Sequence, residues 1–186
     1  MTVLILAAIA AMLTLLFMPA SAVEVDPDLE DAITAHSQAD ALRAACKQVL
    51  LDKSLWPSGD ETHCNQAVAR VAAALGCREL DGLMADGIYA LVSDDKNGRW
   101  TPCDGVNAAM HALCGGLAIA AMTSQQLCMK HGHVAVIFPL PLKRSPSLGR
   151  RVPFVANVGE TVGIMLSSAA FPVARGEAKY FAWCKP

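Results

Sequence analysis

The sequence predicts an α+β fold in which helices come first and a small antiparallel sheet follows. In the first half of the 186-residue chain, apolar residues recur at the spacing of a helix face. In the second half, short apolar runs are bounded by Gly, Pro and Ser, a pattern typical of strands. Helices followed by strands, rather than alternating with them, indicate an α+β domain. The length favours one domain.

The first 22 residues are expected to be a signal peptide. Residues 3–17 are almost wholly apolar, and Pro19-Ala20-Ser21-Ala22 supplies the small residues of a cleavage site after Ala22. The chain departs from a typical signal peptide in that no Lys or Arg precedes the apolar run. The alternative is an uncleaved membrane anchor, but the apolar run is short for a membrane span of about 20 residues. We therefore expect a single domain over residues 23–186, periplasmic or secreted, with no membrane span after leader removal.

Four helices are expected before the sheet. The second should begin near Thr62 as its N-cap and stop at Gly76, since glycine commonly follows a helix end. Pro and Gly mark a loop at residues 56–60. The apolar spacing places the four helices at residues 27–51, 62–75, 83–92 and 106–114.

Five strands are expected after the helices. The stretch Pro139 to Arg151 holds three prolines and four basic residues, so it is expected to be a surface loop between two strands. The short apolar runs place the strands at residues 117–122, 133–138, 152–158, 163–166 and 178–183.

The formal net charge of −2 falls wholly after residue 22. A nucleic-acid-binding domain would present a strongly basic face, so no nucleic-acid partner is expected.

The seven cysteines are an odd number. Exported domains tend to pair their thiols, so six could form three disulfides and leave one free. Cys64 is the natural thiol to remain free, and Cys46 with Cys184 is a guess for one pair. The alternative is that several cysteines are buried free thiols.

Cys64 and His133 have the chemistry of a nucleophile and its base. A cysteine at a helix start meets unsatisfied N–H groups and the positive end of the helix dipole, which should lower its pKa. The backbone N–H groups of Cys64 and Asn65 could hold an oxyanion. His133 opens a strand-like run, and Asn157 is the polar residue of the next strand, suited to orient the imidazole.

Two details compete with this assignment. His131 would share a strand face with His133, so spacing alone does not decide which is the base. The series Cys128-x-x-His131-x-His133 has spacing that could hold a metal with an outside ligand, but no fourth ligand is evident.

Several motifs resemble a known family. His63-Cys-Asn-Gln-Ala-Val-Ala-Arg, Met84-Ala-Asp and Gly132-His-Val-Ala-Val occur in the order found in NlpC-type peptidoglycan cysteine peptidases, and are most similar to amidase effectors of type VI secretion. The resemblance covers roughly residues 46 to 138. Asn65 departs from the small residue that often follows the nucleophile in that family.

The resemblance implies a papain-like fold and hydrolysis of amide bonds in peptidoglycan stem peptides. It implies that Cys64 is the nucleophile and His133 the base, with no metal or organic cofactor. A cognate inhibitor or immunity protein would be a partner. The expected signal peptide argues against direct injection of this protein through a secretion needle. Which bond of the stem peptide is cleaved is left open.

Two other functions stay open. A thiol acyltransferase on the same fold would pass the acyl group to an amine or lipid. A non-catalytic, disulfide-stabilised exported binding domain would keep the scaffold without activity.

Overall fold

The structure, a computed structural model, describes residues 27–59, 61–94, 96, 98–171 and 176–185, with side chains from His36 onward. Residues 33–186 form one compact unit. The expected signal peptide lies outside the described residues.

The unit is built on a six-stranded antiparallel sheet with strand order β1-β6-β2-β3-β4-β5. The sheet, together with the helices, confirms the α+β class. The strands are β1 (Trp100–Cys103), β2 (Ala118–Met122), β3 (His133–Arg144), β4 (Arg151–Val158), β5 (Val162–Leu166) and β6 (Lys179–Trp183).

The four predicted helices are present, with small shifts at their ends. The first matches its predicted bounds, and three short helical segments were not predicted. The helices are α2 (Pro27–Leu51), η1 (Lys53–Leu55), α3 (Cys64–Ala74), α4 (Ala85–Ser93), α5 (Gly105–Leu113), α6 (Ser124–Leu127) and α7 (Ser167–Ala170).

The expected loop over residues 139–151 was wrong, because β3 continues to Arg144. The β3–β4 register shifts between Phe138 and Lys143, and pairing then resumes. Pro139 and Pro141 lie in the shifted stretch, where a missing backbone N–H does not interrupt the ladder. The sequence also missed β1, a four-residue edge strand whose Pro102 is tolerated at an edge.

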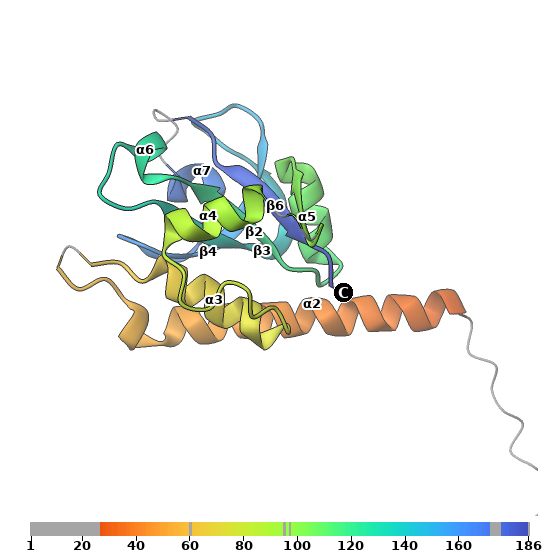
Figure 1. Cartoon of the computed structure of the whole chain (residues 1–186). Coiled ribbons are helices and arrows are strands. Elements are labelled where there is room, and N and C mark those ends of the chain that lie inside the picture. Colours follow the sequence, from red (N-terminus) through yellow and green to blue (C-terminus); the bar gives the residue numbers. More distant parts are fainter. Residues whose placement is uncertain (1–26, 60, 95, 97, 172–175, 186) are drawn as a thin grey trace, which may run out of the picture. The chain divides into compact units, whose positions relative to one another are not determined.

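Helices cover both faces of the sheet (Figure 1). On β6, Phe181 contacts Tyr89 of α4 with ring centroids 5.9 Å apart. The neighbouring Tyr180 lies beside Gly105 at the start of α5 and hydrogen-bonds to Ser167 of α7. Successive strand side chains point to opposite faces, so α4 covers one face while α5 and α7 cover the other.

The helix α3 packs against β3 and beside α4. Cys64, Val68, Val71 and Ala72 recur at helical spacing and form one buried face of the helix. Ala67 and Ala69 are buried as well. Gly76 has φ +95°, and the N–H groups of Gly76 and Cys77 bond to the carbonyls of Ala73 and Ala72. These two bonds form a Schellman motif, and the predicted stop at Gly76 is confirmed. The N-cap, however, is His63 rather than Thr62.

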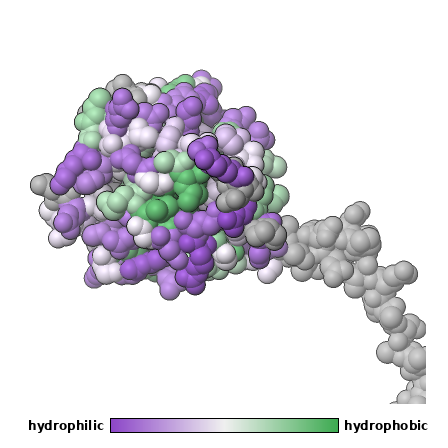
Figure 2. Space-filling view, viewed as in Figure 1, coloured by the Kyte–Doolittle hydropathy of each residue, from purple (hydrophilic) through white to green (hydrophobic). Residues whose placement is uncertain are grey.

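No helix in the described part of the chain is long and apolar enough to cross a membrane. The face shown in Figure 2 is mostly hydrophilic around one central hydrophobic area.

The helix α2 offers a matched pair of leucines for testing the core. Leu42 is fully buried in the core, whereas Leu51 is 77 % exposed. Replacing Leu42 with Ala removes buried apolar surface and leaves a cavity, so we expect the free energy of unfolding to fall by about 2–5 kcal/mol. Urea titration measures the change. Leu51→Ala should alter it by less than about 0.5 kcal/mol, and equal effects would contradict the assigned burial.

Candidate active site

Cys64 is the first residue of α3 and is 3 % exposed. The first N–H groups of a helix have no partner within the helix. Hydrogen bonds from the backbone N–H groups of Val134, Asn65 and Cys64, together with the side chain of Thr62, act on the thiol. The bond from Val134 places the Cys64 sulfur at the beginning of β3, next to the residue that carries the predicted base.

Burial nevertheless raises the pKa of Cys64 above its ordinary value, because desolvation disfavours the thiolate more than these hydrogen bonds stabilise it. The expectation that the helix start lowers this pKa was therefore wrong in direction. The resting group is therefore a thiol rather than a thiolate.

His133 and Asn157 are joined by a hydrogen bond of 2.7 Å between Nε2 and Oδ1. The Asn157 amide nitrogen donates to the carbonyl of Thr161, which fixes the orientation of the side chain. An amide oxygen only accepts, so Nε2 must carry the imidazole proton. The lone pair of His133 is then on Nδ1, the nitrogen left to accept a proton.

The strand register explains why these two residues meet. Val136 pairs with Ala156 across β3 and β4, and continuing this register brings Gly159 opposite His133. Asn157 is then the diagonal neighbour of His133 on the same face of the sheet, within reach of a side chain.

The imidazole of His133 is held between Gly159 and Phe171. A Cβ atom built on Gly159 would lie 2.9 Å from Cε1 of the ring, which is too close. The Phe171 ring packs against the imidazole with centroids 4.9 Å apart. Burial lowers the pKa of His133 below its ordinary value, although the Asn157 bond and the Glu160 charge oppose the shift. The ring is therefore neutral at neutral pH.

Among the hydrogen bonds of the described residues, none joins the thiol of Cys64 directly to the imidazole of His133. The backbone N–H of Val134, the residue after His133, acts on the thiol, whereas the imidazole bonds to Asn157. Nucleophile–base contacts are often loose in ligand-free enzymes and tighten when substrate binds.

Asn65 contributes its backbone to the site and its side chain to the scaffold. Its backbone N–H acts on the Cys64 sulfur. Its side-chain amide donates to the carbonyl of Leu83 at 2.8 Å, which ties the start of α3 to the segment before α4. The backbone N–H groups of Cys64 and Asn65 both favour the thiolate form of Cys64. That they hold an oxyanion stays a prediction.

A cleft of about 330 Å³ opens beside Cys64. One wall comes from the start of α3 and the segment before it, and the other from the start of α4 and the residues before β3. The lining residues are Glu61, Thr62, His63, Cys64, Asn65, Gln66, Met84, Ala85, Asp86, His131 and Gly132.

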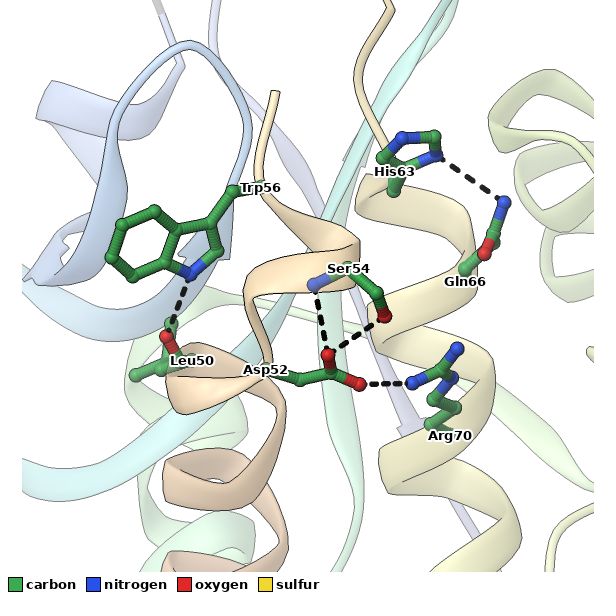
Figure 3. A network of polar contacts seen from close by, with 7 residues as sticks. All are labelled: Leu50, Asp52, Ser54, Trp56, His63, Gln66 and Arg70. Atoms are coloured by element: carbon green, nitrogen blue, oxygen red, sulfur yellow. Dashed lines mark hydrogen bonds and ion pairs between the residues drawn. The ribbon is translucent and has the colours of Figure 1, made fainter. Parts of the chain in front are cut away.

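A polar network anchors α3 next to the preceding segment (Figure 3). Asp52 accepts hydrogen bonds from the N–H and hydroxyl of Ser54 and from the guanidinium of Arg70, which lies on α3. Hydrogen bonding by Ser54 is the main reason that the pKa of Asp52 is lowered. In the same view, Gln66 contacts the ring of His63, with 3.3 Å between Nε2 and Nδ1. These contacts join α3 to the residues that precede it in the chain.

His131 lies before β3 rather than in it, so the expected strand alternation with His133 does not apply. It is exposed and lines the cleft. Cys128, the C-cap of α6, has φ 49°, and its thiol contacts the carbonyl of Gln125. Among the described residues, no three His, Cys, Asp or Glu side chains are grouped so that they could hold a metal ion.

All seven cysteines lie in the described part of the chain, and all are free thiols. The three expected disulfides, including the guessed pair Cys46–Cys184, are not formed. Burial raises the pKa of Cys46 to about 12 and that of Cys77 to about 11. Cys64 is therefore distinguished by its place at a helix start and a cleft, not by the parity of the cysteines.

The sequence reasoning missed Gly159, Phe171 and Asp86. Gly159 follows directly on the β4 run, where a Gly after Val158 was available as a signal of close approach. Asp86 belongs to the Met84-Ala-Asp motif named above, although no role was assigned to it there. Phe171 comes close to the site only through the tertiary fold.

No family model matches this chain, and no curated protein matches it significantly.

Gly159→Ala tests the support of the imidazole. The added methyl should push the His133 ring away from Asn157, and the NMR signal of the Nε2 proton should shift or broaden. Gly87→Ala is the matched control, because a Cβ there would meet Leu83 only at ordinary contact distances of 3.7–3.9 Å. An unchanged signal in Gly159→Ala would show that the ring is not confined in this way.

Alkylation of Cys64 by iodoacetamide tests the direction of its pKa shift. Since burial raises this pKa, the thiolate fraction should be small at neutral pH, and the labelling rate should keep rising above pH ~9. Peptide mass spectrometry assigns the label to Cys64, and the urea-unfolded chain serves as the reference without the shift. A rate that levels off below pH ~7 would instead reveal a preformed thiolate.

Proposed function

We propose that this protein is a cysteine hydrolase that cleaves amide bonds with Cys64 as nucleophile, His133 as general base and Asn157 as the residue that orients the imidazole. The hydrogen bond between His133 Nε2 and Asn157 Oδ1 carries this proposal. It leaves Nδ1 as the basic nitrogen of a neutral ring, near a helix start that bears a buried thiol.

The proposed reaction begins from a neutral thiol and a neutral imidazole. As the Cys64 sulfur attacks the amide carbonyl, its proton passes to Nδ1 of His133, and the backbone N–H groups of Cys64 and Asn65 stabilise the oxyanion. The C–N bond then breaks, and His133 returns the proton to the leaving amine. Water attacks the thioester with His133 again taking a proton, which releases the acid and restores the thiol.

We further propose a papain-like, NlpC-type fold and peptidoglycan stem peptides as substrates, in a periplasmic or secreted setting. These proposals rest on the motif resemblance around Cys64 and His133, together with an α+β architecture in which a helix bearing the cysteine packs against the strand bearing the histidine. An open cleft at the nucleophile is compatible with an extended peptide.

Substitution of the three residues tests the proposal with purified muropeptides as substrate. Cys64→Ala should lower kcat/KM at least roughly 1,000-fold, and His133→Ala roughly 100- to 10,000-fold. Asn157→Ala should have a smaller effect, because it acts through the imidazole. Chromatography with mass spectrometry of the products measures cleavage.

Two control variants sharpen this test. Cys128→Ala removes an exposed thiol outside the cleft lining and should retain most of the activity. His131→Ala removes the competing histidine from the cleft lining and should cost less activity than His133→Ala. Persistent cleavage by Cys64→Ala would disprove the assignment of Cys64 as the nucleophile. Loss of activity in His131→Ala but not in His133→Ala would show that His131, and not His133, is the general base. Transfer of the acyl group to an added amine would assign an acyltransferase.

A further inference from the structure

The charged side chains that line the cleft beside Cys64 are acidic. Its lining includes the carboxylates of Glu61 and Asp86, and among the lining residues that the structure describes none is Lys or Arg. Its other titratable side chains are His63, His131 and Cys64. Near neutral pH the fixed charges of the cleft are therefore negative, which favours a cationic group and opposes an anionic one.

The carboxylate of Asp86 is held in a defined orientation. Asp86 lies in the first turn of α4, and its Oδ1 accepts a hydrogen bond of 2.7 Å from the backbone N–H of Ser124. A Cβ atom on Gly132 would lie 2.6 Å from this same oxygen, so the absence of a side chain at Gly132 lets the carboxylate approach. Among the described residues, no hydrogen bond uses the second oxygen, Oδ2.

The position of Asp86 relates this charge to the reacting groups. Its neighbour Gly132 directly precedes His133, and Val134 contacts the Cys64 sulfur. On the other side, Asn65 bonds to Leu83, just before α4. The carboxylate therefore lies on the wall that joins the nucleophile to the base-bearing strand. Glu61, by contrast, is exposed, and water screens its attraction for a cationic group.

We propose that this cleft selects peptides that carry a free ammonium group close to the scissile amide, and that Asp86 is the residue that pairs with it. This inference rests on the proposed function, since it places the substrate against Cys64. Within stem peptides, the fitting group is the side-chain amine of a diamino acid that has not been cross-linked. A fixed, half-buried carboxylate discriminates well because a charge-assisted hydrogen bond is stronger than a neutral one.

The test compares two peptides that differ in one group: a stem peptide with a free diamino-acid side chain, and the same peptide acetylated on that amine. The wild-type protein should prefer the free amine in kcat/KM by roughly 10- to 100-fold. Asp86→Asn should bring the ratio close to one mainly by losing activity on the free-amine peptide. Asp86→Glu, which keeps the charge, should retain part of the preference.

Asp81→Asn is the matched control, because it removes the same charge from an exposed position outside the cleft lining. It should leave the ratio unchanged. Circular dichroism checks that each variant is folded. If Asp86→Asn does not fold, the test is made with Asp86→Glu instead.

A binding experiment separates this inference from the catalytic proposal. Cys64→Ala protein, alone and combined with Asp86→Asn, is titrated with both peptides by calorimetry. If the wild-type protein cleaves neither peptide while Cys64→Ala still binds the free-amine form more tightly through Asp86, the catalytic proposal fails and the ammonium site stands. If the two peptides are bound and cleaved equally well, the ammonium site is overturned and the hydrolase stands.

Discussion

The candidate site depends on the antiparallel pairing of β3 with β4. That register sets Asn157 diagonally beside His133 and brings Gly159 against the imidazole. A slip of one residue would turn the side chain of Asn157 to the opposite face of the sheet and remove the hydrogen bond. Because several cross-strand pairs on both sides of β4 share this register, the geometry of the base is a property of the sheet rather than of one contact.

Two opposing effects act on the thiol. The start of α3 offers N–H groups that favour a thiolate, while burial within the core removes the water that would solvate it. Burial prevails, and the neighbouring imidazole is also kept neutral by burial. A neutral thiol and a neutral imidazole are the starting forms that the proposed mechanism requires. A preformed ion pair, in which a cationic histidine lowers the pKa of the thiol, would be a different resting state.

Much of the fold could be predicted because its signals are local. Helical spacing identified α2 with its observed bounds, and Gly76 identified the end of α3. The pairing of His133 with Asn157 could be expected from two adjacent strands, each with a polar residue in an apolar run. The fold-dependent features could not be predicted in this way. The bulge that absorbs Pro139 and Pro141, the free state of the cysteines, the direction of the Cys64 pKa shift and the approach of Asp86 to Gly132 all depend on distant segments.

The two glycines beside the base-bearing strand imply different evolutionary constraints. Gly159 must lack a side chain because the His133 ring occupies that space, so a descendant that had lost the histidine would be free to change it. A Cβ atom on Gly132 would lie 2.8 Å from the backbone carbonyl oxygen of Met122 and would also meet Asp86, and no substitution elsewhere removes a backbone carbonyl. Among distant relatives, Gly132 should therefore mark the fold itself, whereas Gly159 should mark those lineages that still carry the histidine.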